Sequence, residues 1–233
     1  FNQPLNSWNV SSVTDMNNMF GGGNSGPFPI FNQDISSWDV SSVTNMVSMF
    51  ENNQVYSQDI VGWNFASGSN MQEMFFKSAY NGNIGSWNVG NVTNMNQMFR
   101  LTPNFNQDIT SWDVSNVTDM TYMFANSSFN QDIGNWDVSS VTVMTQMFAN
   151  SSFNQDLGNW DVSNVTDMNY MFTNANSLST ENYSNTLIGW AALPTLQSGV
   201  RLRASSQYNS SAVAARNTLV NTYGWVISDL GLA

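Results

Sequence analysis

The sequence predicts an α/β solenoid: a right-handed coil with short parallel strands on one side, short helical turns on the other, and an α/β cap at its C-terminal end. Three observations support this fold class. A fixed period of 20 to 50 residues is typical of stacked repeats, and tryptophan recurs here in steps of 24 or 25 residues after a first step of 30. Each of these tryptophans is followed by the pattern M-x-x-M-F, and these patterns account for all 14 methionines. The pattern ends after Thr173, where helical spacing replaces it. The repeat tryptophans are Trp8, Trp38, Trp63, Trp87, Trp112, Trp136 and Trp160.

The elements of one repeat can be read from residues 31–50, FNQDISSWDVSSVTNMVSMF. The W-x-V part at Trp38 and Val40 alternates with the period of two that is typical of a short strand. The segment V-T-x-M-x-x-M-F follows, and its apolar residues fall at i, i+3, i+6 and i+7, which favours one or two helical turns. Thr44 precedes these turns and is a reasonable N-cap.

One repeat cannot bury its apolar side alone, so we expect repeats to stack about 4.8 Å apart with like residues over like. The tryptophan column could in principle be an exposed ladder for sugar rings. Its phase matches that of the Ile and Val residues, however, which favours the core, and the methionines share the face of Val and Phe. Residues 21–30, GGGNSGPFPI, form an insertion rich in Gly and Pro that predicts a loop.

The chain is expected to divide into a seven-repeat solenoid over residues 1–175 and a capping segment over residues 176–233, packed on it as one unit. A solenoid needs such a cap to cover its apolar end. Ser179 or Thr180 should begin a first helix, and Ser210 should begin a second, with Gly224 as its stop. Residues 225–231 are expected to form a last strand, with another strand between the helices. Arg216 lies among alanines on the second helix, and we expect it to make a structural ion pair.

The repeat F-N-Q-D-I-S-x-W-D-V-S-x-V-T-x-M-x-x-M-F resembles that of the BspA-like leucine-rich-repeat surface proteins. The tail is similar to segments that often follow such repeats: L-S-x-x-N-Y-x-x-x-L-I-G-W at residues 178–190, L-Q-S-G-V at 196–200 and A-A-R-x-x-L-x-x-x-Y-G-W at 214–225. The resemblance covers almost the whole chain. It implies a leucine-rich-repeat-like solenoid, a secreted or cell-surface location, and a role in adhesion or interaction. It supplies no catalytic residues.

Composition excludes several classes of function. The net charge of −11, with only five lysines and arginines, argues against nucleic-acid binding, which needs a basic face. The absence of histidine and cysteine removes imidazole bases, disulfides and the usual zinc sites. The sequence has no apolar run of 18 residues, so no transmembrane segment is predicted. The chain starts inside a repeat without Met, so we expect it to be a fragment or a processed product.

The exposed sheet face is the predicted ligand-binding surface, because polar residues alternate there with the buried ones. A second row of aspartates, at the corner that leads into each strand, could bind Ca²⁺ through carboxylate oxygens or could cap backbone amides. The candidate calcium residues are Asp108, Asp132 and Asp156. The candidate ligand-binding residues are Ser37, Asp39, Ser111, Asp113, Asn135, Asp137, Asn159 and Asp161.

Repeated, solvated aspartates do not favour catalysis, since a glycosidase needs one carboxyl with a raised pKa in a cleft. We therefore expect a non-enzymatic, extracellular repeat protein without a required cofactor. It is expected to bind a protein or a glycan on another cell or surface. The alternatives are a structural subunit or spacer of a surface layer or filament that self-associates end to end, and a calcium-stabilised surface module.

Overall fold

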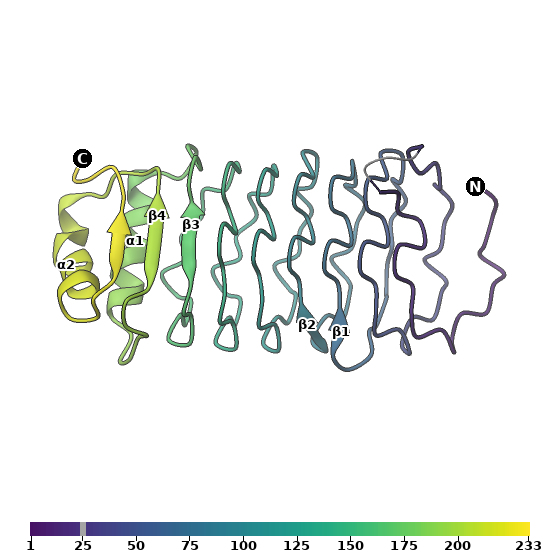
Figure 1. Ribbon diagram of the computed structural model, residues 1–233, viewed down its shortest axis with the longest axis horizontal. Helices are drawn as coiled ribbons and strands as arrows, with labels where there is room; N and C mark the ends of the chain where they lie inside the picture. The colour runs from purple at the N-terminus through teal and green to yellow at the C-terminus, as the bar shows by residue number, and fades with distance from the viewer. Residues whose placement is uncertain (24–26) are drawn as a thin grey trace.

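The structure is a computed structural model that describes residues 1–23 and 27–233. Successive repeats lie side by side along the long axis of the molecule, and the two helices of the C-terminal segment lie at one end (Figure 1). Part of the loop expected at residues 21–30 falls on residues 24–26, outside the described residues.

The segment T-x-M-x-x-M-F forms the hydrogen-bonded ladder between coils, and the expectation of helical turns there was wrong. Three N–H groups of the second coil donate to backbone carbonyls of the third coil at 2.8–3.0 Å: Met46 to Asn70, Ser48 to Gln72 and Phe50 to Met74. The spacing of three between methionines comes from a tight turn, in which the Met49 N–H donates to the Met46 carbonyl at 3.2 Å. The turn requires a positive φ, 56° at Ser48. No helix is found in residues 1–23 or 27–175.

The ladder is regular enough to count as strand only in places. β1 (Ser69–Asn70) pairs in parallel with β2 (Val92–Asn94), and single bridges join the corresponding residues of the other coils. Thr44 is not an N-cap, because its N–H donates to the Thr14 carbonyl of the preceding coil at 2.9 Å. Coils of this kind depend on their neighbours for backbone hydrogen bonds.

The W-x-V segment turns corners, so the strand expected there was also wrong. Trp38 N–H donates to the Ile35 carbonyl at 3.1 Å, and Val43 N–H donates to the Val40 carbonyl at 2.9 Å. The aspartates that precede these turns bond the backbone locally, which competes with ladder formation. The candidate residues predicted for a sheet face therefore lie on turns.

The core consists of columns with one side chain from each coil. Rings of Phe50, Phe75, Phe99 and the later phenylalanines stack with centroids 5.3–5.9 Å apart. The repeat tryptophans from Trp38 onward are at most 4% exposed, which confirms the core interpretation. In five coils the indole N–H donates to a carbonyl of the preceding coil, at 2.6–3.3 Å. The aromatic columns thus bind neighbouring coils by packing and by hydrogen bonds.

The F-N-Q part of the repeat forms a second, polar connection between coils. Asn130 Oδ1 accepts the Asn154 N–H at 2.7 Å and the Gln155 side-chain amide at 3.0 Å. The Asn154 side chain in turn accepts the Ser179 N–H at 2.8 Å. The same bonds that join repeats therefore also join the last repeat to the C-terminal segment.

The C-terminal segment contains α1 (Thr180–Ala191), β4 (Arg201–Ala204), a 3-10 helix (Ser210–Ala212), α2 (Val213–Asn221) and β5 (Val226–Ser228). Ser179 caps α1 by accepting the Asn182 N–H at 3.1 Å. Trp190 continues the tryptophan column, because its indole donates to the Leu157 carbonyl at 3.0 Å. Gly224, just after α2, has the positive φ (67°) of a helix stop.

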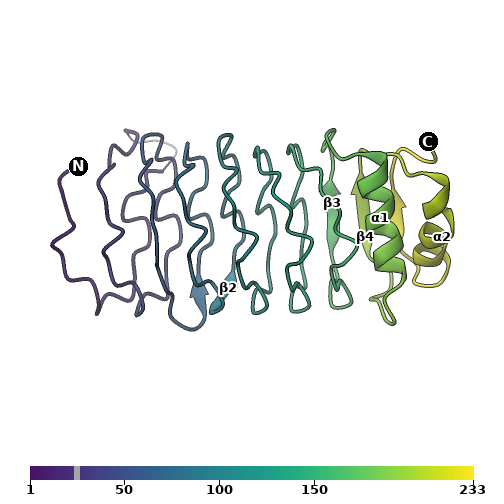
Figure 2. The same cartoon turned by 180° about the vertical axis from the view of Figure 1, so that it is seen from behind.

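β4 and β5 extend the ladder of the last repeat. β3 (Met168–Phe172), β4 and β5 form a parallel sheet in that order. α1 covers one face of it, behind β4 in Figure 1 and in front of β4 in Figure 2. Arg216 makes the expected ion pair, with Nε 2.9 Å from Asp229 Oδ2. Within the described part of the chain, none of the helices has the length and apolar character needed to cross a lipid bilayer.

Candidate functional site

The structure brings four of the eight candidate ligand-binding residues together. Asn135 and Asp137 from one coil, with Asn159 and Asp161 from the next, line an open depression of about 340 Å³ that Gly134 and Trp136 complete. We call this the corner depression. The other four, Ser37, Asp39, Ser111 and Asp113, are also exposed and occupy the same turn in other coils, outside the depression.

Each aspartate of this row holds its own turn together. Asp137 Oδ1 accepts the Ser139 N–H and Asp161 Oδ1 accepts the Ser163 N–H, both at 3.0 Å. Hydrogen bonds to a carboxylate favour its charged form. Accordingly, the Ser139 hydroxyl and N–H lower the pKa of Asp137, and those of Ser41 lower the pKa of Asp39. The carboxylates of Asp39 and Asp137 thus remain charged at neutral pH, with Oδ2 left to contact a ligand.

The serines and asparagines of the row differ in their availability. The Ser37 and Ser111 hydroxyls donate to carbonyls of the preceding coil, Asn6 at 3.4 Å and Gly85 at 3.3 Å. Asn135 and Asn159 are exposed at the depression. The depression therefore offers two carboxylates and two amides, with no aromatic platform, because Trp136 is only 3% exposed.

The aspartates considered for calcium lie in separate coils and cap turns. Asp108, Asp132 and Asp156 accept the N–H groups of Thr110, Gly134 and Gly158 at 3.0, 3.0 and 2.8 Å. The Thr110 hydroxyl and N–H also lower the pKa of Asp108. Among residues 1–23 and 27–233, no group of three or more acidic side chains is arranged to hold a metal ion. Their geometry favours the capping alternative, and calcium binding stays a prediction.

A third row of capping residues was not recognised from the sequence. Asp15, Asp119 and Asp167 accept the N–H of Asn17, Thr121 and Asn169, each at 2.8 Å. The signal was the recurring Asn or Asp two residues after the V of V-T-x-M. This row begins the ladder, so its role is structural.

A different surface was also missed. Arg201 and Arg203 are exposed on β4, and the Arg203 guanidinium lies 5.4 Å from the ring centroid of Tyr170 on β3. Arg at alternate positions of a predicted strand, in R-L-R, was the available signal, because it places both on one face.

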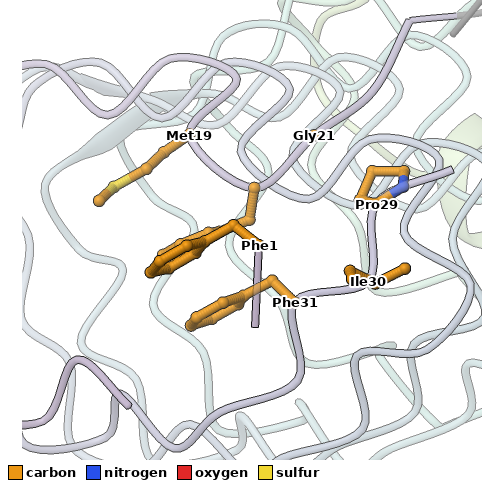
Figure 3. A pocket seen from close by; sticks show the side chains of 7 residues that line it. Phe1, Met19, Gly21, Pro29, Ile30 and Phe31 are labelled. Atoms are coloured by element: carbon orange, nitrogen blue, oxygen red, sulfur yellow. The ribbon is translucent and has the colours of Figure 1, made fainter. Parts of the chain in front are cut away.

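A smaller apolar pocket lies at the first coil. Figure 3 shows Phe1, Met19, Ile30 and Phe31 around it, and its volume is about 170 Å³. The ring of Phe31 stacks on Phe20 with centroids 3.7 Å apart. Among the residues that the structure describes, none of the side chains lining this pocket is charged.

Comparison with known proteins identifies the repeats but not their role. A family model described as a Mycoplasma protein of unknown function, DUF285, matches residues 1–81 and 70–186. The two overlapping matches cover the repeats and the start of α1. No curated protein and no solved structure matches the chain.

Proposed function

The chain belongs to the DUF285 family, whose function is unknown, and we propose that it is a non-enzymatic, extracellular recognition protein built on a leucine-rich-repeat-like solenoid. Its task is to bind a protein or glycan on another cell or surface. The observation that carries the proposal is the corner depression, where four exposed polar side chains from two coils converge. The regular coils provide a rigid support, which is the kind of element on which a binding surface keeps its geometry.

The chemistry of the depression favours a partner with cationic or hydroxyl groups. Asp137 and Asp161 supply two charged oxygen acceptors, while Asn135 and Asn159 supply amides that both donate and accept. Lysine or arginine side chains of a protein would complement the carboxylates. Sugar hydroxyls could bond the same groups, but Trp136 is buried and gives no ring on which a sugar could stack. A protein partner with a basic surface therefore fits better than a neutral glycan.

The test uses charge-neutral variants that keep the fold. Asp137→Asn with Asp161→Asn retains the Oδ1 acceptor of each turn and removes both charges. Wild type and variant are applied to an array of purified extracellular proteins and glycans, and binding is measured at low and moderate salt. We expect the variant to lose binding to the partner found with wild type, and we expect salt to weaken that binding.

Asp39→Asn is the matched control, since Asp39 makes the same turn far from the depression. It should leave binding unchanged. The proposal fails if partners found with wild type bind the Asp137/Asp161 variant equally well, or if Asp39→Asn has the same effect.

The second candidate is a structural spacer that self-associates end to end. It is favoured by exposed apolar side chains at the first coil, where Phe1 is 68% and Trp8 is 53% exposed. Exposed apolar surface of this kind is typical of association sites. Sedimentation over a range of protein concentrations should then show association, and Trp8→Ser should suppress it. A monomer at every concentration contradicts this candidate.

A further inference from the structure

A second depression lies on the open face of the β3-β4-β5 sheet. Its volume is about 270 Å³, and its lining consists of Asn169, Tyr170, Arg201, Leu202, Arg203, Val226 and Ser228. We call it the basic depression. α1 covers the opposite face of this sheet (Figures 1 and 2), and along β4 the side chains alternate, with Arg201 and Arg203 exposed and Leu202 and Ala204 buried.

The charge of the basic depression is opposite to that of the molecule. The chain carries a net charge of −11, but none of the described residues that line this depression is acidic. Neither Arg201 nor Arg203 forms an ion pair within residues 1–23 and 27–233. The two residues lie two positions apart on one strand, so their backbones are about 7 Å apart. Both guanidinium groups can therefore reach one ligand, and each can take a carboxylate through two parallel hydrogen bonds.

Aromatic and amide groups accompany the arginines. Tyr170 is 38% exposed, with the Arg203 guanidinium 5.4 Å from its ring centroid. Asn169 and Ser228 border the same depression. Together these residues supply an aromatic ring, two guanidinium groups, an amide and a hydroxyl. It suits a ligand that has both a hydrophobic face and polar groups around its edge.

The same pairing of tyrosine and arginine occurs a second time along the ladder. Tyr122 occupies the position of Tyr170 two coils earlier, with the same left-handed backbone, φ 57° against 60°. The Arg100 guanidinium lies 4.5 Å from the Tyr122 ring centroid. Gln146, in the coil between, donates to the Tyr122 hydroxyl at 2.5 Å. Two coil spacings of about 4.8 Å put the two tyrosines about 10 Å apart.

We infer that this line of residues, from Arg100 and Tyr122 to Tyr170, Arg201 and Arg203, binds an acidic polysaccharide running along the stack of coils. Its sugar rings would lie beside the tyrosines, and its carboxylates would bind the exposed Arg201 and Arg203. This site goes beyond the proposed function, because it uses a different face and a ligand of opposite charge from the partner of the corner depression.

A nucleic acid fits the line less well. Nucleic-acid binding depends on a dense row of cations that neutralises successive phosphates, whereas here three arginines are spread over about four coil spacings, or about 19 Å. Sparse cations next to tyrosines match a polymer in which carboxylates are separated by uncharged sugar surface. The strong negative charge of the rest of the chain would also repel a polyanion with a charge on every unit.

The experiment measures binding to hyaluronate, in which a charged glucuronate alternates with an uncharged sugar, by affinity electrophoresis and titration calorimetry. Carboxyl-reduced hyaluronate and polyuridylate are the comparison polymers. We expect wild type to bind hyaluronate and not the reduced polymer. Arg201→Gln and Arg203→Gln should each weaken binding about tenfold, and Tyr170→Ala should also weaken it.

Asp137→Asn with Asp161→Asn is the matched control and should bind hyaluronate as well as wild type does, which separates this site from the corner depression. Because Arg201 and Arg203 are exposed, their variants should keep the denaturation midpoint of wild type, and this is checked for each. The inference is overturned if wild type does not bind hyaluronate, if it binds the reduced polymer equally, if it prefers polyuridylate, or if the Arg201/Arg203 double variant binds like wild type.

Discussion

Two tyrosines in neighbouring coils should respond in opposite directions to the same substitution. Tyr56 and Tyr80 both occupy the position that is Phe in the consensus, and their rings stack with centroids 5.8 Å apart. The Tyr56 hydroxyl is buried and has no hydrogen-bond partner among the residues that the structure describes. The Tyr80 hydroxyl donates to the Gln58 carbonyl at 3.3 Å. Tyr56→Phe should therefore stabilise the protein, and Tyr80→Phe should destabilise it.

The magnitudes follow from the hydrogen bonds. A buried polar group without a partner costs about 1–3 kcal/mol, so removal of the Tyr56 hydroxyl should raise the free energy of unfolding by about 1 kcal/mol. The Tyr80 bond is long for a hydroxyl donor, and its loss should cost about 0.5–1 kcal/mol. The two variants should thus differ by about 2 kcal/mol, which for a chain of this size is about 4–8 °C in Tm.

The assay is urea denaturation of wild type and both variants, followed by tryptophan fluorescence and circular dichroism in parallel. Coincident curves from the two probes are needed before free energies are compared, because long repeat arrays can lose cooperativity. The reasoning is refuted if Tyr56→Phe lowers the midpoint as much as Tyr80→Phe does.

The same tyrosines should make the protein sensitive to alkaline pH. Burial, with a smaller contribution from the charge of Asp34, raises the pKa of Tyr56 far above its usual value, and burial likewise raises that of Tyr80. A raised folded-state pKa gives stability that is complete below the unfolded pKa of about 10 and is lost as pH rises above it. Tyr56→Phe should reduce this loss, which the urea midpoint at pH 8 and above pH 10 would measure.

Three further outcomes are expected. Asn130→Ala should lower the free energy of unfolding by about 2 kcal/mol, because two inter-coil bonds of about 1 kcal/mol each are lost; an unchanged urea midpoint would contradict this. Hydrogen bonding lowers the pKa of Asp34 and Asp108, so the stability of the protein should fall as pH drops below about 4. Thermal melts of Asp108→Asn should show a smaller fall in Tm than those of wild type. Added Ca²⁺ or EDTA should leave Tm unchanged, since the candidate aspartates cap separate turns; a Ca²⁺-dependent rise in Tm would restore the calcium alternative.

Periodicity identified the core residues and the C-terminal helices, but it did not identify the secondary structure of the repeat. A spacing of three between Met46 and Met49 fits a helical face and also fits a tight turn closed between these residues. The turn depends on a positive φ at the intervening residue, and glycine would normally signal it. That position holds Ser48, Glu73, Gln97 and Tyr122 in successive coils, so the sequence carried no signal for the turn.

Only part of the candidate site was predicted, and the rest was missed for a similar reason. The alternation of polar and apolar residues correctly placed Asp137 and Asp161 in solvent. It could not show that each aspartate bonds an N–H two residues ahead and so bends the chain out of a strand. Arg201 and Arg203 were overlooked because their meaning depends on β4 being the neighbour of β3, a pairing between residues about 30 positions apart that local sequence does not specify.

The left-handed residues of the ladder connect the fold to both proposed sites. A non-glycine residue with positive φ costs about 1–2 kcal/mol, and within the coils this cost is offset by bonds to a neighbour: Gln146 N–H, for example, donates to the Asn169 carbonyl of the next coil at 3.0 Å. The geometry of each coil therefore depends on the coil beside it. The corner depression joins two neighbouring coils, and the basic depression joins β3, β4 and β5. A ligand in either site contacts residues that are correctly placed only while these elements are stacked. Binding should consequently stabilise the stack by mass action, so that a rise in the unfolding midpoint reports occupancy of either site.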